Sequence, residues 1–380
     1  MVVKIADNIL SPLGKTTQEN LQAVQAYRSA LSLHRMWDVP EPFMASLFAE
    51  DQLEEHSYEG ALRQSITQAL VEANLLSGLD ASGKNPRSGA DASFANALAS
   101  DRTLLILSST KGQATGPEGE PMGQTARRLA RHFGLTTEPI TVSNACISGL
   151  SAQILAMRML EMGECDLAIV AGCDIQSKFI VSGFQSFHAV SDEECRPFDE
   201  DRFGLNLGEA AATVIYARSA EAASDQWVLT CGAVRNDAFH ISSPSKTGEG
   251  CFRALHHVMQ GVDAARLACI SAHGTATLYN DDMESRAIAR AGLSDVLVCG
   301  LKGYYGHTMG AAGLLETILT MHAIDDGWVP GTRGYQACGT MCELNVSPRH
   351  VATDRRQFVK LMSGFGGCNA AALFKKGDEL

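Results

Sequence analysis

The chain has 380 residues, of which 45% are hydrophobic, and a formal net charge of −12 at pH 7. Such a length can bury a large core, and the negative charge argues against a nucleic-acid partner, because phosphate binding needs a basic surface. The sequence has no apolar run of about 18 residues and no basic-then-apolar N-terminus, so we expect neither membrane insertion nor a secretory signal. Eleven scattered cysteines without a CxxC pair favour reduced thiols and a cytoplasmic location.

The first chemically informative element is an extended apolar segment at 140–142 that leads into a helix-like stretch at 147–160. Cys146 lies at the start of that helix, where free N–H groups and the helix dipole favour a thiolate. Ser148 and Gly149 follow and let another backbone or a thioester approach closely. We therefore predict that Cys146 is a nucleophile and acyl acceptor. The alternative is a cysteine that packs as a small hydrophobic residue.

A polar run at 219–226 separates the apolar stretches "AATVIYA" and "WVLTCGAV". We expect the boundary between two similar halves here, with an N-terminal half over 1–222 and a C-terminal half over 223–380.

The next element is a short apolar strand that ends just before a His-Gly elbow and a polar loop. His273 therefore lies at the C-terminal end of a strand, where open α/β sheets bind ligands. Thr275 and Thr277 offer two hydroxyls that suit a polar substrate arm. Asp281 and Glu284 are three residues apart and share one helix face. The alternative for this pair is an N-cap at Asp281 and a solvated acidic face.

A third element repeats this pattern, since an apolar strand leads into a glycine-rich turn that carries Lys302 and His307. A helix opened by small residues follows, as it does after Cys146. Two such units suggest duplicated βαβ halves that bring their reactive side chains together where they meet. In isolation, the Gly-His-Thr sequence is more typical of a turn with a helix cap.

The fourth element, "SGFGG" at 363–367, joins two apolar runs near the C-terminus. Its glycines permit positive φ angles and loop movement, so Phe365 can cover a pocket. The alternative is an ordinary β-hairpin turn.

Taken together, these elements resemble the β-ketoacyl-acyl carrier protein synthases of the thiolase fold. Six motifs carry the resemblance, in the order in which that family has them: "VSNACISG", "RPFDEDRFGLNLGEAA", "NDAFHISSP", "AHGTATLYNDDME", "LKGYYGHTMGAAG" and "SGFGG".

The resemblance implies an α/β fold with two similar βαβ-rich halves in a five-layered αβαβα body. It implies decarboxylative condensation of an acyl-cysteine thioester with malonyl-acyl carrier protein, in fatty-acid or polyketide-type synthesis. The expected partners are an acyl carrier protein, which carries acyl and malonyl groups on phosphopantetheine, and a second copy of the chain. No cofactor and no metal are expected.

The resemblance also implies residue roles. Cys146 is the nucleophile that takes the acyl chain, and His273 and His307 flank the malonyl thioester and stabilise its enolate. Lys302 pairs with Glu284 and organises the two histidines. Two neutral imidazoles with a cysteine thioester also suit this chemistry on physical grounds, because decarboxylation needs preorganised donors at the enolate oxygen.

The resemblance implies further roles around this centre. Phe365 gates the pocket, and its backbone N–H forms an oxyanion hole with that of Cys146. Thr275 and Thr277 hold the pantetheine arm, and Asp281 supports the loop that carries them. The expected acyl-pocket residues are Ile147, Phe184, Phe187 and Leu205.

Some positions depart from the family pattern. Ala276 stands at the centre of "HGTAT", where the family more often has glycine, and Leu205 occupies a position where an acyl-pocket aromatic is common. The condensation chemistry does not depend on these positions, so the departures concern the length and shape of the acyl chain.

Two other functions within the fold stay open. A non-catalytic subunit similar to chain length factors is one, although such subunits typically lack the nucleophile. A thiolase or a synthase that uses coenzyme A is the other, although "GHTMGAAG" fits the carrier-dependent branch better. Arg127, Arg128 and Arg131 are candidates for docking an acidic carrier, but solvated helix arginines are the more ordinary explanation.

Overall fold

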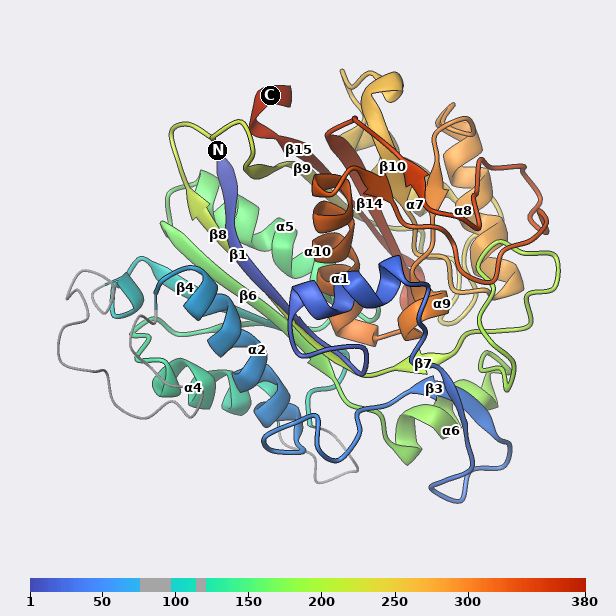
Figure 1. Cartoon of the computed structure of the whole chain (residues 1–380), viewed down its shortest axis with the longest axis horizontal. Coiled ribbons are helices and arrows are strands. Elements are labelled where there is room, and N and C mark those ends of the chain that lie inside the picture. Colours follow the sequence, from blue (N-terminus) through green and yellow to red (C-terminus); the bar gives the residue numbers. More distant parts are fainter. Residues whose placement is uncertain (76–96, 114–120) are drawn as a thin grey trace.

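The structure is a computed structural model that describes residues 1–75, 97–113 and 121–380 (Figure 1). Its strands are β1 (Val2–Leu10), β2 (Ser32–His34), β3 (Phe43–Ser46), β4 (Thr103–Ser108), β5 (Ile140–Val142), β6 (Leu167–Asp174), β7 (Leu207–Gly208), β8 (Ala210–Arg218), β9 (Trp227–Asn236), β10 (Leu267–Ser271), β11 (Val298–Cys299), β12 (Trp328–Val329), β13 (Val351–Ala352), β14 (Gln357–Gly364) and β15 (Cys368–Lys376). Its α-helices are α1 (Thr17–Gln25), α2 (Tyr58–Glu72), α4 (Met122–His132), α5 (Ser148–Glu161), α6 (Lys178–Ser186), α7 (Glu249–Val258), α8 (Leu278–Arg290), α9 (Lys302–Tyr305) and α10 (Ala312–Asp325).

Ten of the described strands form one sheet in the order β11-β10-β14-β15-β9-β1-β8-β6-β4-β5, while β12 pairs with β13 and β3 lies between β2 and β7 in a small third sheet. The two ends of the large sheet are built alike. In the N-terminal part, β1, β8 and β6 pair antiparallel and β6, β4 and β5 pair parallel. In the C-terminal part, β9, β15 and β14 pair antiparallel and β14, β10 and β11 pair parallel. A single residue pair, Val3 with Val228, joins the parts. The predicted pair of similar halves is therefore confirmed, while a boundary at 222/223 stays a prediction.

Two helices lie between these halves of the sheet. Helix α5 contacts β4, β6 and β8 on one side and β9 and β15 on the other, and α10 contacts β1 and β8 as well as β10 and β14. Helices α2 and α4 cover the outer face of the N-terminal half, and α7, with α8 against it, covers the C-terminal half (Figure 1). Almost every residue of α10 is buried, as expected for a helix that is apolar all round. The five-layered αβαβα prediction is confirmed.

Glycines let the two central helices approach closely. A Cβ added to Gly149 on α5 would lie 2.7 Å from the carbonyl oxygen of Gly310, and one added to Gly313 on α10 would lie 2.5 Å from the backbone nitrogen of Leu150. Either contact is too short for a real side chain. The small residues that follow Cys146 therefore serve close packing against the segment that follows His307.

Two expectations from composition concern the chain as a whole. All eleven cysteines are free thiols, in agreement with the scattered pattern. Among the described residues, no helix has both the length and the apolar character needed to cross a membrane.

Candidate active site

The proposed nucleophile lies in a sharp turn between β5 and α5. Cys146 is 5% exposed, and the preceding residue, Ala145, has a φ of 46°, which L-residues rarely adopt. The hydroxyl of Ser148 fixes this turn, since it accepts from the Asn144 N–H at 2.8 Å and donates to the Ala145 carbonyl at 2.6 Å. The turn presents Cys146 to the cavity at the start of the helix.

Burial governs the charge of this thiol. Desolvation raises the pKa of Cys146 to about 12, and nearby Lys302 and the backbone N–H of Phe365 lower the pKa by less. The expectation that the helix start favours a thiolate is therefore wrong for the unliganded protein. The exclusion of water destabilises the charged thiolate by more than Lys302 and the Phe365 N–H stabilise it.

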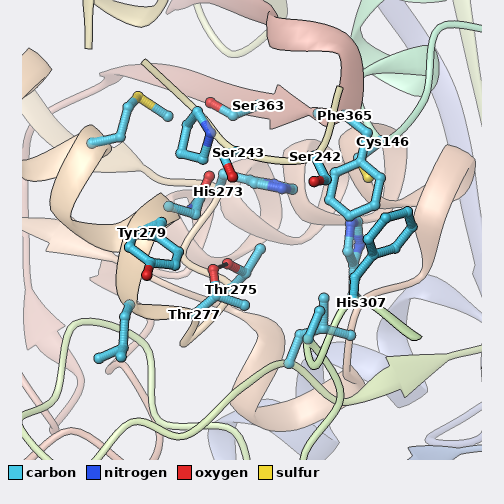
Figure 2. Close-up of a pocket in the computed structure, with 18 of the residues that line it drawn as sticks. Cys146, Ser242, Ser243, His273, Thr275, Thr277, Tyr279, His307, Ser363 and Phe365 are labelled. Carbon is cyan, nitrogen blue, oxygen red and sulfur yellow. Dashed lines mark hydrogen bonds between the residues drawn. The ribbon is translucent and has the colours of Figure 1, made fainter. Parts of the chain in front are cut away.

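Two histidines from the C-terminal half complete a compact cluster with this thiol. The ring centroids of His273, just after β10, and His307, just after α9, are 5.0 Å apart, and the rings meet edge to face at 81°. One donor atom each from Cys146, His273 and His307 all lie within 4.8 Å of one another. All three line one pocket, seen in Figure 2.

Both imidazoles are neutral. Burial, with help from Lys302 and Lys360, holds the pKa of each histidine well below its usual value. The Met309 N–H donates to Nδ1 of His307 at 3.2 Å, so the ring proton of His307 sits on Nε2. Nε2 of His307 and Nδ1 of His273 are buried without a partner. His307 thus presents an unused N–H donor to the pocket.

The backbone around His273 is held by charged side chains. The Glu284 carboxylate accepts from the N–H groups of His273 and Gly274, each at 2.7 Å, and burial raises its pKa to about 7. Lys302 Nζ donates to the His273 carbonyl at 2.6 Å and pairs with Glu316 at 2.7 Å. The expected pairing of Lys302 with Glu284 is therefore wrong. The two side chains bind opposite polar groups of His273, and both oxygens of Glu284 are occupied by backbone donors.

Two members of this cluster were not found from the sequence. Lys360 on β14 is fully buried and pairs with Glu316 at 2.6 Å, and Glu316 on α10 is 3% exposed. The sequence does contain a signal for these two residues, because each is an isolated charged residue within an apolar run. Such a residue is almost never fully buried unless it is paired.

Asp281 supports the loop that follows His273. Its carboxylate accepts from the N–H groups of Thr275 at 3.0 Å, Ala276 at 3.1 Å and Phe198 at 2.8 Å. Asp281 and Glu284 are both completely buried, so the alternative of a solvated acidic face is wrong.

The pocket has a cavity volume of about 230 Å³. Thr275 and Thr277 line it, and their hydroxyl oxygens are 2.9 Å apart. The expected lining residues Phe184, Phe187 and Leu205 also face it. Ile147 does not, because its side chain is fully buried in the apolar core between the two halves of the sheet, so that assignment is wrong.

Phe365 lies in the hairpin turn between β14 and β15, so the turn interpretation is right and the residue still lines the pocket. Its ring is 5.4 Å from that of Phe184 and 5.6 Å from that of Phe187. Gly366 and Gly367, with φ of 82° and 74°, supply the left-handed backbone of the turn. Phe365 therefore packs with Phe184 and Phe187 in an aromatic cluster that lines the same pocket as Cys146.

The arginines considered for carrier docking lie on α4, away from the pocket lining. Arg127 pairs with Glu138 at 2.6 Å, and Arg128 pairs with Glu59 at 2.6 Å. The charge of each of these two arginines is thus neutralised by a neighbouring carboxylate. This favours the interpretation of the arginines as ordinary surface residues of a helix.

The donor set of Cys146, His273 and His307 is of the kind that holds Zn²⁺. The ammonium groups of Lys302 and Lys360 lie behind the histidines and oppose a cation there. We therefore assign no metal to this cluster.

Comparisons with known proteins agree with the geometry. Residues 41–222 match the family described as the N-terminal domain of β-ketoacyl synthase, and residues 227–336 match the C-terminal domain of the same family.

Two relatives illustrate the sequence similarity. Nodulation protein E of Rhizobium meliloti is 31% identical over 288 residues, which cover 72% of this chain and 71% of that protein. The 3-oxoacyl-[acyl-carrier-protein] synthase 2 of Vibrio cholerae is 32% identical over 272 residues, covering 66% of this chain and 65% of that protein.

Solved structures agree in fold. A β-ketoacyl synthase from Burkholderia phymatum superposes with a TM-score of 0.82 at 23% identity, over 99% of both chains. A ketosynthase in complex with its chain length factor from Xenorhabdus doucetiae gives a TM-score of 0.81 at 22% identity, over 99% of this chain and 98% of that chain. At this level of identity the likeness is evidence of the fold alone.

Proposed function

The chain belongs to the β-ketoacyl synthase family of carbon–carbon bond-forming acyltransferases, and on this premise we propose that it condenses an acyl group on Cys146 with a malonyl group. The proposed donors are acyl and malonyl thioesters of an acyl carrier protein, as the name of the Vibrio cholerae relative suggests. The product is a 3-oxoacyl thioester of the carrier.

In the first step the sulfur of Cys146 attacks the acyl thioester and the carrier thiol leaves with the proton that the cysteine gives up. The raised pKa of Cys146 means that this proton must move as the carbon–sulfur bond forms. The N–H groups of Cys146 and Phe365 form the proposed oxyanion hole. The backbone N–H of Phe365 lowers the pKa of Cys146, and this donor beside the sulfur supports the role.

In the second step the malonyl thioester loses carbon dioxide, and the electrons of the broken carbon–carbon bond form an enolate. His273 and His307 stabilise its oxygen by donating N–H groups. The enolate carbon then attacks the acyl carbonyl, and the cysteine sulfur leaves and takes up a proton from solvent water. The observation that carries this proposal is the placement of two buried neutral imidazoles within 4.8 Å of a buried thiol.

The remaining residues would handle the substrate. Thr275 and Thr277 would hold the pantetheine arm, and Phe365 would gate access to an acyl pocket lined by Phe184 and Leu205. The hydroxyl pair on one side of the pocket and the aromatic cluster on the other support this division.

We also propose that the chain forms a homodimer. Strand β5 is at one end of the ten-stranded sheet and leads directly to Cys146, so pairing of two copies along β5 would extend the sheet. The non-catalytic, chain-length-factor-like alternative is not favoured, because Cys146, His273 and His307 are present and assembled. A cytoplasmic location stays a prediction.

Intact-mass spectrometry tests the proposal. The purified protein is incubated with acyl carrier thioesters from short to long chains, and the expected result is one acyl mass on Cys146 that malonyl carrier protein then discharges. The Cys146→Ala variant is the control and should take up no acyl group while its thermal unfolding stays close to that of the wild type. Equal acylation of the variant and the wild type would refute the nucleophile assignment.

A further inference from the structure

A buried lysine that is not part of the proposed reaction centre lies directly behind it. Lys360 is in the middle of β14 and its side chain is completely buried. Its Nζ donates to Glu316 Oε2 at 2.6 Å, to the Ala272 carbonyl at 3.0 Å and to the Ser271 carbonyl at 3.1 Å. Three acceptors match the three N–H bonds of an ammonium group, whereas a neutral amine has only two.

These contacts hold the end of the strand that carries His273. The carbonyls of residues 271 and 272 accept from Lys360, and the next carbonyl, that of His273, accepts from Lys302. The N–H groups of His273 and Gly274 donate to Glu284. The Nδ1 atom of the His273 ring has no partner, so the clamp on its backbone sets the position of the ring.

Lys360 also sets the charge behind the two imidazoles. The Glu316 carboxylate lies between two ammonium groups, with one oxygen bound to each. The three side chains together carry one net positive charge, and this charge adds to burial, which is the larger cause of the lowered pKa of both histidines. The ionisable groups near the imidazoles are Cys146 at the start of α5, Asp174 at the end of β6, Glu284 on α8, Lys302 on α9, Glu316 on α10 and Lys360 on β14. Asp281 on α8 acts on Glu284, and Cys368 on β15 acts on Cys146.

The reaction needs these imidazoles neutral. A neutral imidazole donates a hydrogen bond to the enolate and keeps its proton. An imidazolium is a far stronger acid and can transfer its proton, so that an N–H bond breaks, a C–H bond forms at the enolate carbon, and an acetyl thioester results instead of the condensation product. For His307 the geometry points the same way, since the Met309 N–H faces Nδ1 and leaves no room for a second proton there.

We propose that Lys360 is a positioning residue that clamps the strand end before His273 and adds a positive charge behind His273 and His307. This inference rests on the proposed function, because protonated histidines would divert the malonyl-derived enolate to an acetyl thioester. It extends the site to a residue that contacts neither substrate nor the imidazoles themselves.

The test compares Lys360→Met with the wild type in the ratio of acetyl thioester to 3-oxoacyl thioester formed from malonyl carrier protein. Loss of a nearby positive charge is expected to move histidine protonation up by about one pH unit, which is about a tenfold change in the protonated fraction. The ratio should therefore be about tenfold higher in the variant than in the wild type at each pH between about 8 and 6.

Lys376→Met is the matched control. Lys376 is 4% exposed and pairs with Asp325, so the variant also loses a buried ammonium, but on β15 away from the pocket. Its product ratio should follow that of the wild type at every pH. A Lys360→Met ratio that also follows the wild type, with only a lower unfolding temperature, would mean that the lysine is merely structural and would overturn the proposal.

A measurement on the unmodified protein tests the neutral imidazoles that the proposal requires, whether or not Lys360→Met folds. Imidazole ¹⁵N spectra of the wild type, assigned with His273→Ala and His307→Ala, should show both rings neutral down to about pH 5.5, below the ordinary histidine value. A titration of either ring with a midpoint between about 6 and 7 would overturn the proposal. These spectra need no turnover. If the condensation assay alone fails, the proposed function is contradicted, and the spectra still test the inference about Lys360.

Discussion

Cys146 and the two histidines face the same cavity, but different forces hold them there. On the cysteine side the chain uses backbone shape. Ala145 takes a left-handed conformation, and Gly149 brings α5 against the carbonyl of Gly310. The bonds that fix this turn are neutral, from Ser148 to its neighbours.

On the histidine side the chain uses buried charge. Glu284, Lys302 and Lys360 bind the backbone around His273, and Glu316 joins the two lysines. The nucleophile should therefore be sensitive to added volume, and the histidines should be sensitive to changes in charge.

The histidine side should control decarboxylation alone. His307→Ala removes a preorganised N–H donor, and the loss of one such donor costs about 10²- to 10³-fold in rate. We expect release of carbon dioxide from malonyl carrier protein to fall by that factor while acyl transfer to Cys146 changes by less than about tenfold. Radiometric carbon dioxide release and intact-mass acylation measure the two steps. An equal loss in both steps would contradict the division.

Charge on the histidine side should also make stability depend on pH. Burial raises the pKa of Glu284 from its ordinary value of 4.5 to about 7, so the folded protein binds this proton more tightly than the unfolded chain. The resulting stability is fully present below about pH 4.5 and is lost as the pH rises through about 7. The full change is on the order of 3 kcal/mol.

Denaturant unfolding of the wild type and Glu284→Gln across this pH range checks the prediction. The Gln variant is expected to be less stable overall, because an amide can accept only one of the two N–H bonds well, yet its stability should depend less on pH. Parallel pH curves for the two proteins would show that Glu284 does not titrate in this range.

The cysteine side should respond to volume. Gly149→Ala places a methyl group 2.7 Å from the Gly310 carbonyl oxygen, and overpacking of this kind costs about 1–3 kcal/mol in the free energy of unfolding. Gly123→Ala on α4 is the control, because a Cβ there meets nothing within 4 Å. Urea unfolding should show a loss for Gly149→Ala and no loss for the control. Equal stability of the two variants would mean that the helices can separate freely.

The smallest effect is expected at the strained turn. Ala145→Gly relieves a φ of 46° but makes the unfolded chain more flexible, so the two contributions offset to within about 1 kcal/mol. Ala156→Gly, in the middle of α5, should instead cost about 1 kcal/mol because it gains no such relief. Thermal unfolding of both variants distinguishes the cases, and a larger loss for Ala145→Gly than for Ala156→Gly would contradict the strain.

Much of the fold and the centre of the site followed from local patterns. The cysteine and each histidine come after an apolar strand and within a turn rich in small residues, so their convergence at one edge of the layered body could be predicted. The motif order added the family. None of this required knowledge of contacts between distant side chains.

The errors came where contacts between distant segments decide the outcome. Lys302 pairs with Glu316 rather than Glu284, and no local pattern shows which carboxylate already binds backbone N–H groups. Ile147 is adjacent to Cys146 in sequence, yet one helical step turns its side chain into the core. The pKa of Cys146 depends on how completely water is excluded from around the thiol. The position of Cys146 at the start of a helix gives no information about that burial.

The central claim is that the chain couples loss of carbon dioxide to formation of a carbon–carbon bond at Cys146. Single-turnover analysis tests it most directly, by mixing acylated protein with malonyl carrier protein and measuring carbon dioxide and 3-oxoacyl thioester together. The account predicts that both appear at the same rate and in equal amounts as the acyl group leaves Cys146. Release of free fatty acid, or of carbon dioxide without a 3-oxoacyl product, would contradict it.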